Sequence, residues 1–340
     1  MTPENKQSTR TSIDTKTNTA GTDTPVHIED GIAHGQTSPT IEYDNKGISG
    51  IVRSPYVVGA ALLASLGGFS FGYDQGVISL ILTMPQFHKQ FPDIAPGHSH
   101  YGFNTGFMTG MLEFGAFIGC LFFPMLADRY SRKWGLAIAT VFFCIGAIIQ
   151  TAAHNYGTLV AGRTIGGIGV GTLAMGSPLY ISEIAPPNLR GSLLVLEYIS
   201  IVVGAIISYW ITYGTREIAG DWSFRLPFLL QMAPALGIGI GIQFFPFSPR
   251  WLAMRHRNDD SLRSLEKLRR LPETDSRIQQ EWKGILREVE LQESALVWEH
   301  GTDTHFAILE LKQWGDLFKP KYLRRTAVAL AIPFFQQFSG

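Results

Sequence analysis

The sequence predicts an all-α integral membrane protein. Six long apolar stretches and a low content of charged residues lead to this prediction. Of the 340 residues, 45% are hydrophobic and 16% are charged, whereas globular proteins usually carry about 25% charged residues. The formal net charge is zero, so the chain has no overall field that would attract nucleic acid, and we expect no nucleic-acid partner.

Each of the six stretches is long enough to cross a bilayer, which requires about 20 mostly apolar residues. They lie at about 56–83, 102–126, 134–153, 157–181, 191–213 and 224–246. A seventh apolar run begins near Thr326 and reaches Gly340, so we expect the chain to be truncated within a seventh span. Residues 1–50 hold no apolar core of the length that a signal peptide needs.

The spans divide the chain into four parts. Residues 1–54 are rich in Thr, Ser, Asp and Asn, which predicts a disordered cytoplasmic tail. Residues 55–247 form a six-helix transmembrane domain, and residues 248–322 are too polar to span and form a cytoplasmic helical linker. Residues 323–340 are then the start of a further transmembrane domain.

The distribution of Lys and Arg predicts how the chain lies in the membrane. Most of these 28 residues fall in the tail, in the loops after the second and fourth spans, and between Arg250 and Arg325. Only Lys89, Arg216 and Arg225 fall on the opposite side. Because cytoplasmic segments carry the excess of Lys and Arg, we expect the N-terminus and the linker to be cytoplasmic.

Part of the linker has the pattern of an amphipathic helix. Leucines recur every three residues, with charged residues between them, at Leu262, Leu265, Leu268 and Leu271. Such a helix lies on the membrane surface or packs beneath the bundle, and the alternative is a solvated linker helix. A second helix is expected near 279–293.

Ionisable residues inside the spans point to function, because burying them in lipid is costly. Asp74 lies in the first span and Arg163 at the start of the fourth. A carboxylate that alternately pairs with Arg and takes a proton is suited to coupling, and the alternative is a structural salt bridge. Glu113 and Glu197 also lie in spans, and for them a packing role in the helix interior stays open.

No catalytic constellation appears in the sequence. Residues 162–171 read Gly-Arg-Thr-Ile-Gly-Gly-Ile-Gly-Val-Gly. A dinucleotide-binding loop of this kind needs a preceding strand, which is missing, so the glycines indicate close helix packing instead. The histidines of the outward loops and span ends have no ligand spacing or carboxylate partners: His88, His98, His100 and His154. We therefore expect no enzyme activity, no cofactor and no metal.

Four motifs stand at fixed places relative to the spans. Residues 128–133 read Asp-Arg-Tyr-Ser-Arg-Lys, and residues 178–191 read Pro-Leu-Tyr-Ile-Ser-Glu-Ile-Ala-Pro-Pro-Asn-Leu-Arg-Gly. Residues 246–252 read Pro-Phe-Ser-Pro-Arg-Trp-Leu, and residues 336–340 read Gln-Gln-Phe-Ser-Gly. In this combination the chain resembles the sugar porter family of the major facilitator superfamily over about residues 55–340. The residues of its motifs are most similar to those of fungal members.

The resemblance implies a fold and a set of functional residues. The fold is the N-terminal six-helix half of a major facilitator, a cytoplasmic helical linker and the start of the seventh span. Asp74 and Arg163 match the pair that the resemblance associates with proton coupling. The charges at the cytoplasmic helix ends are expected to form the gate, because ion pairs there can latch one conformation: Asp128, Arg129, Arg132, Glu183, Arg190 and Arg250.

A sugar site is expected from amide and aromatic side chains. Gln336 and Gln337 offer donors and acceptors that suit sugar hydroxyls, and Phe71 can pack on the apolar face of a pyranose. Tyr198 stands where the family usually has a sugar-contacting Gln, and Ala205 stands at a second such position. Further departures are Ser131, Pro124 and Phe247, which replace two usual glycines and a usual acidic residue.

These residues predict transport of a hexose, disaccharide or polyol by alternating access, with proton symport favoured. Three alternatives stay open: a sugar sensor that does not transport, a carrier of another solute such as a cyclic polyol acid, and a fragment without function. The expected partners are the sugar, a proton and the lipid bilayer, with no oligomer required. The family default places the protein in the plasma membrane.

Overall fold

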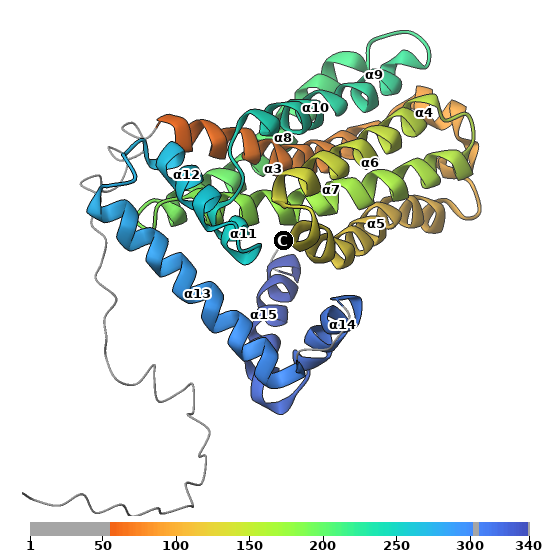
Figure 1. The fold of residues 1–340 in the computed structure, drawn as a ribbon. Coiled ribbons are helices and arrows are strands. Elements are labelled where there is room, and N and C mark those ends of the chain that lie inside the picture. The colour runs from red at the N-terminus through yellow and green to blue at the C-terminus, as the bar shows by residue number, and fades with distance from the viewer. Residues whose placement is uncertain (1–54, 302–305, 339–340) are drawn as a thin grey trace, which may run out of the picture. The chain divides into compact units, whose positions relative to one another are not determined.

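The computed structural model of the chain describes residues 55–301 and 306–338 (Figure 1). The predicted disordered tail at residues 1–54 lies outside the described residues. Within the described part of the chain, six segments are long and apolar enough to cross a membrane. Five are single helices, α3 (Pro55–Ile81), α5 (Tyr101–Arg129), α6 (Arg132–Ala152), α7 (Tyr156–Ile184) and α8 (Arg190–Thr215), and the sixth runs over Trp222–Phe244. The predicted all-α membrane fold with six spans is confirmed.

The sixth span keeps a helical backbone throughout, but its hydrogen-bond pattern is interrupted at Gln231, which the apolar pattern does not reveal. It consists of α9 (Trp222–Leu230), α10 (Met232–Gly241) and the short 3-10 helix η2 (Ile242–Phe244). The break falls at Gln231, because Pro234 has no N–H with which to continue the ladder of hydrogen bonds across it. Gln231 is fully buried at this break.

Glycines let the spans approach one another closely. A Cβ atom added to Gly167 of α7 would lie 2.2 Å from the Leu112 oxygen of α5, and one added to Gly169 would lie 2.4 Å from the Phe143 nitrogen of α6. Gly72 of α3 meets α8 in the same way. Only glycine permits such backbone contacts, so α7 packs between α5 and α6.

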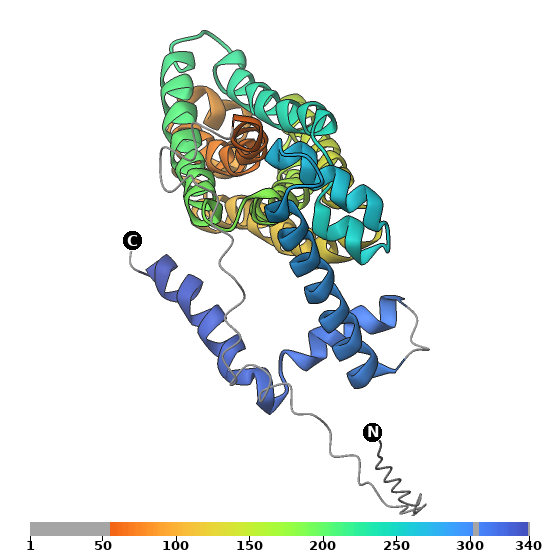
Figure 2. The same cartoon turned by 60° about the vertical axis from the view of Figure 1, so that its left-hand side comes forward.

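The two inner helices of the bundle are α3 and α7. Their apolar windows are 56% and 61% buried, against 22% for α8. In Figure 2, where the spans are seen closer to end-on, α3 is surrounded by other spans. Both inner helices carry an ionisable residue, and the surrounding helices shield these residues from lipid.

The loop between the first two spans contains two short helices that were not predicted. They are α4 (Pro85–Gln90) and the 3-10 helix η1 (Pro92–Ile94). Each has Pro in its first turn, where the fixed φ of proline favours a helix start. The buried ring of Phe87 packs on Phe224 of α9 with centroids 5.3 Å apart, so the loop is part of the packed bundle.

The predicted amphipathic helix packs beneath the bundle. It is α12 (Asn258–Arg269), preceded by the short helix α11 (Pro249–Met254). Leu265 and Leu268 are buried, and Leu268 joins the same apolar cluster as Ile184 at the end of α7. The alternative of a solvated linker helix therefore does not hold for α12.

Three further helices follow in the described part of the chain: α13 (Ser276–His300), α14 (Phe306–Asp316) and α15 (Pro320–Phe338). α13 is longer than the helix expected near 279–293, and the Asp275 side chain caps it by accepting from the Arg277 N–H. α15 begins before Thr326, because Lys and Arg are good helix formers although they lower the hydropathy.

Candidate functional site

A buried ion pair joins the two inner helices. Arg163 Nη1 of α7 lies 3.1 Å from Asp74 Oδ1 of α3, and the two side chains are 1% and 0% exposed. Asp74 Oδ2 and Arg163 Nε have no hydrogen-bond partner within the described part of the chain. A buried charge pair offsets its desolvation only when further hydrogen bonds complete it, so this incompletely bonded pair is suited to opening as well as closing.

Two glycines and a buried amide side chain lie next to Arg163. Gly162 and Gly166 flank it on α7, and both contact the buried Gln150 of α6. Gln150 Nε2 donates to the Gly162 oxygen over 3.4 Å, while Gln150 Oε1 has no partner among the described residues. Polar groups from three spans therefore gather in the interior of the bundle.

The other two carboxylates within spans differ from each other. Glu113 of α5 is exposed and accepts a hydrogen bond from Gln75 Nε2 of α3. Glu197 of α8 is 2% exposed and packs against Gly68 of α3, where an added Cβ would lie 2.4 Å from Glu197 Oε1. A packing role in the helix interior therefore fits Glu197 and not Glu113.

A second charged cluster centres on Arg132, at the end of the bundle where α5 ends and α6 begins. Arg132 Nη1 lies 3.0 Å from Asp128 Oδ1, and Nη2 lies 2.9 Å from Glu183 Oε1. Arg132 Nη1 also donates to the Ala127 oxygen, and the arginine is buried. One side chain thus ties the last turn of α5 to the last turn of α7.

Three arginines predicted for the gate do not join that cluster. Arg129 and Arg190 are exposed and have no ion pair within the described ranges. Arg250 of α11 pairs instead with Glu288 of α13, at 3.0 Å. The structure therefore brings Asp128, Arg132 and Glu183 together and leaves the other three apart.

Two departures from the family motifs have visible consequences. Ser131 adopts a φ of 130°, a region that favours glycine, and its hydroxyl caps α6 by accepting from the Trp134 N–H. Where the family has an acid, the ring of Phe247 lies 4.6 Å from Lys133 Nζ. A cation–π contact therefore occupies the place that an ion pair would take.

Three of the residues expected at a sugar site have described side chains, and they lie on three different helices, α3, α8 and α15. Phe71 of α3 is half-buried and packs against an apolar cluster that includes Phe143 and Val170. Tyr198 of α8 is 64% exposed, and Gln336 of α15 is exposed. The side chain of Gln337 lies outside the described residues.

Several contacts at the same end of the bundle were missed by sequence reasoning. Lys133 Nζ donates to the Gln243 and Phe245 oxygens over 3.0 and 2.7 Å, which completes the last turn of the sixth span. Arg269 of α12 donates to the Ile184 oxygen over 2.7 Å and forms a paired contact with Glu281 of α13. Arg269 and Glu281 lie in the charged linker, and only their burial distinguishes them from the other charged residues there.

Comparison with known proteins finds a matching family model and similar transport proteins. The family model described as sugar (and other) transporter matches residues 60–340. The low-affinity glucose transporter HXT1 of Saccharomyces cerevisiae is 32% identical over 92% of this chain and 53% of its own length. The high glucose sensor RGT2 of the same yeast is 33% identical over 82% of this chain and 35% of its own length.

A solved structure is similar as well. It is the major facilitator proton:xylose symporter XylE bound to 6-bromo-6-deoxy-D-glucose, with a TM-score of 0.64 and 27% identity over 73% of this chain and 57% of that one. This chain spans about half the length of the relatives it matches. It is a multi-pass membrane protein, and it belongs to the sugar transporter family of the major facilitator superfamily.

Proposed function

We propose that this chain forms the N-terminal six-helix half of a sugar carrier that works by alternating access and moves a proton with the sugar. The buried pair of Asp74 and Arg163, 3.1 Å apart within the spans, is the observation that carries the proposal. The relatives support the substrate class, since HXT1 is named a glucose transporter and XylE a proton:xylose symporter. In such carriers the site lies between two six-helix halves.

Proton coupling follows from the chemistry of the pair. While Asp74 is ionised, it holds Arg163 and ties α3 to α7. When a proton binds to the Asp74 carboxylate, the charge that attracts Arg163 disappears and the tie weakens. A sugar that binds more tightly to one of the two arrangements then couples its own movement to that of the proton.

The Arg132 cluster is suited to the gate. Opening this end of the bundle separates the ends of α5 and α7, which breaks the contacts of Arg132 with Asp128 and Glu183. Arg129, Arg190 and Arg250 complete the proposed gate. The excess of Lys and Arg supports a cytoplasmic position for this end, the N-terminus and the linker, and we place the carrier in the plasma membrane, with no oligomer required.

The sugar contacts fall to Phe71, Tyr198, Gln336 and Gln337 in this proposal. Their side chains supply aromatic faces and amide groups, which suit the apolar faces and the hydroxyls of a sugar ring. Tyr198 replaces the usual Gln of the family. We therefore propose that Tyr198 determines the selectivity among hexose, disaccharide and polyol.

Uptake of labelled sugars tests the proposal. The complete gene is expressed in cells that lack sugar carriers, and uptake of a hexose, disaccharide and polyol panel is followed. We expect uptake of at least one sugar, and Tyr198→Gln is expected to change the preference among them. Tyr209→Gln, on the same helix and outside the proposed site, serves as the matched control.

A second candidate function is a glucose sensor, which the similarity to RGT2 favours. A sensor binds sugar without moving it. Protein that reaches the cell surface and binds sugar, but takes up none of the panel, would replace the carrier proposal by the sensor. Neither binding nor uptake would favour a different solute, as Tyr198 and Ala205 also permit.

A further inference from the structure

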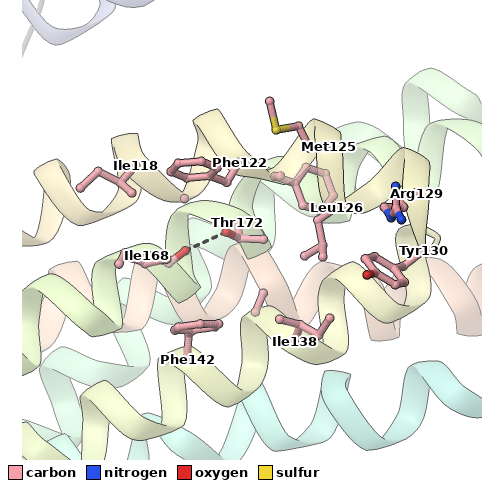
Figure 3. A pocket seen from close by; sticks show the side chains of 13 residues that line it. Ile118, Phe122, Met125, Leu126, Arg129, Tyr130, Ile138, Phe142, Ile168 and Thr172 are labelled. Atoms are coloured by element: carbon pink, nitrogen blue, oxygen red, sulfur yellow. Dashed lines mark hydrogen bonds between the residues drawn. The ribbon is translucent and has the colours of Figure 1, made fainter. Parts of the chain in front are cut away.

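An apolar groove runs along the outside of three spans. α5 and α6 both pack on α7 but contact each other little, so a cavity of about 590 Å³ opens between them. Its walls include Phe122 and Leu126 from α5 and Ile138 and Phe142 from α6, and Ile168 of α7 forms part of its floor (Figure 3). A volume of this size is typical of ligand pockets, which span about 300–1,000 Å³.

The interior of the groove has no unsatisfied polar group that an occupant would have to bind. Thr172 contributes a hydroxyl to the floor, and this hydroxyl donates to the Ile168 oxygen of its own helix over 2.8 Å (Figure 3). The other floor and wall residues away from the mouth are apolar or glycine. A hydrocarbon chain therefore fits the groove without leaving a polar group unsatisfied.

The polar groups of the groove are confined to one end. Figure 3 shows Arg129 and Tyr130 together at that end, with Ile118 at the other. Arg129 has no acidic partner among the residues the structure describes, although its neighbours Asp128 and Arg132 are paired. An unmatched guanidinium beside a phenol hydroxyl is complementary to an anionic phosphate group.

We propose that this groove binds an anionic glycerophospholipid, with one acyl chain between α5 and α6 and the headgroup on Arg129. The walls of the groove belong to helices that are long and apolar enough to span a membrane, so lipid is an available occupant. The polarity of the groove also matches a lipid, apolar along its length and cationic at the end. The binding site rests on the membrane position of the chain and is independent of which solute is carried, whereas its effect on the gate rests on the proposed function.

Binding here bears on the gate. Arg129 is next in sequence to Asp128, whose carboxylate pairs with Arg132. A lipid that fills the space between α5 and α6 supports both helices on either side of that pair. It therefore stabilises the arrangement in which the Arg132 cluster is closed.

Photo-crosslinking lipids test the site. The complete carrier is reconstituted into liposomes with a phosphatidylserine or a phosphatidylcholine tracer that bears the same diazirine acyl chain, and crosslinked peptides are mapped by mass spectrometry. We expect crosslinks at Phe122, Met125 and Ile138, with about fivefold more from phosphatidylserine, since one basic side chain near a membrane surface contributes about that factor. Arg129→Gln should make the two tracers equal, whereas Arg216→Gln, at an exposed arginine outside the groove, should not.

A groove-filling variant separates the cavity from the charge. Ile138→Trp should lower groove crosslinking by both tracers, and Val141→Trp, at an exposed position of the same helix outside the groove, should leave it unchanged. No crosslinks in the groove from either tracer would overturn the proposal that a lipid occupies it. Equal yields from the two tracers in the wild type would overturn the assignment of Arg129 as the headgroup site.

Discussion

Ser131 shows how one residue adapts to a position that favours glycine. Its φ of 130° is strained for a side chain with a Cβ atom, at a cost of about 1–3 kcal/mol. Its hydroxyl offsets part of this strain by capping α6, where it accepts from the Trp134 N–H. A helix cap of this kind loses only a few tenths of a kcal/mol when Gly replaces Ser.

Replacing this serine should therefore stabilise the protein. We expect Ser131→Gly to raise the free energy of unfolding by about 1 kcal/mol, because relief of strain exceeds the entropy cost of glycine. The apparent melting temperature of the purified protein checks this. Ser79→Gly, inside a regular helix, should lower it. A lower melting temperature for Ser131→Gly would mean that the cap matters more than the strain.

At the scale of elements, α7 is held by backbone contacts rather than by large side chains. A Cβ at Gly167 would lie 2.2 Å from the Leu112 oxygen, and a backbone atom cannot move aside as a flexible side chain can. At Gly157 of the same helix the nearest atom would be 3.7 Å away, which is an ordinary contact. Identical substitutions at the two positions therefore test the packing alone.

Gly167→Ala is expected to destabilise the bundle by about 1–3 kcal/mol, because α5 must move away from α7. Gly157→Ala is expected to be neutral or slightly stabilising, since alanine favours helix. Thermal unfolding followed by size-exclusion chromatography compares the two. Equal melting temperatures would show that α5 and α7 are not closely packed at Gly167.

The linker is fastened to the bundle by Arg269. Its guanidinium binds the Ile184 oxygen at the end of α7 and both carboxylate oxygens of Glu281, with 3% of the arginine side chain and 9% of the glutamate side chain exposed. Removing one partner of a buried pair leaves the other charge uncompensated, at about 3–5 kcal/mol. The sequence around Arg269 gives no sign of this role.

Arg269→Met should release α12 and α13 from the bundle. We expect faster amide hydrogen exchange and faster proteolysis within residues 258–300, while the spans keep their protection. Arg263→Met is the matched control, because that arginine is exposed and its contact with Asp260, at 4.0 Å, is long for an ion pair. Unchanged exchange in Arg269→Met would mean that apolar contacts such as those of Leu268 suffice to hold the linker.

For the whole molecule, the sequence predicted what local composition determines. Apolar stretches located the six spans. The free-energy cost of placing ionisable side chains in lipid singled out Asp74 and Arg163, which the structure joins. The break at Gln231 was missed because hydropathy does not register a lost backbone hydrogen bond. Which arginines pair was also beyond prediction, since Arg132 and Arg129 look alike in sequence and differ only in their neighbours.

Proton coupling through Asp74 is the central claim, and proton movement itself tests it most directly. The complete carrier is reconstituted into liposomes that contain a pH-sensitive dye, and the transported sugar is added outside. The wild type should acidify the lumen as sugar enters. Asp74→Asn should exchange sugar in counterflow without acidification, because an amide cannot take the proton. Asp221→Asn, at an exposed carboxylate that pairs with Arg225, should behave as the wild type.

Counterflow normalises for any loss of folded protein in Asp74→Asn, where Arg163 is left without its partner. Sugar-dependent acidification in the wild type, absent from Asp74→Asn while counterflow remains, is the result we predict. Acidification that persists in Asp74→Asn, or wild-type uptake without any pH change, would contradict proton coupling through this pair.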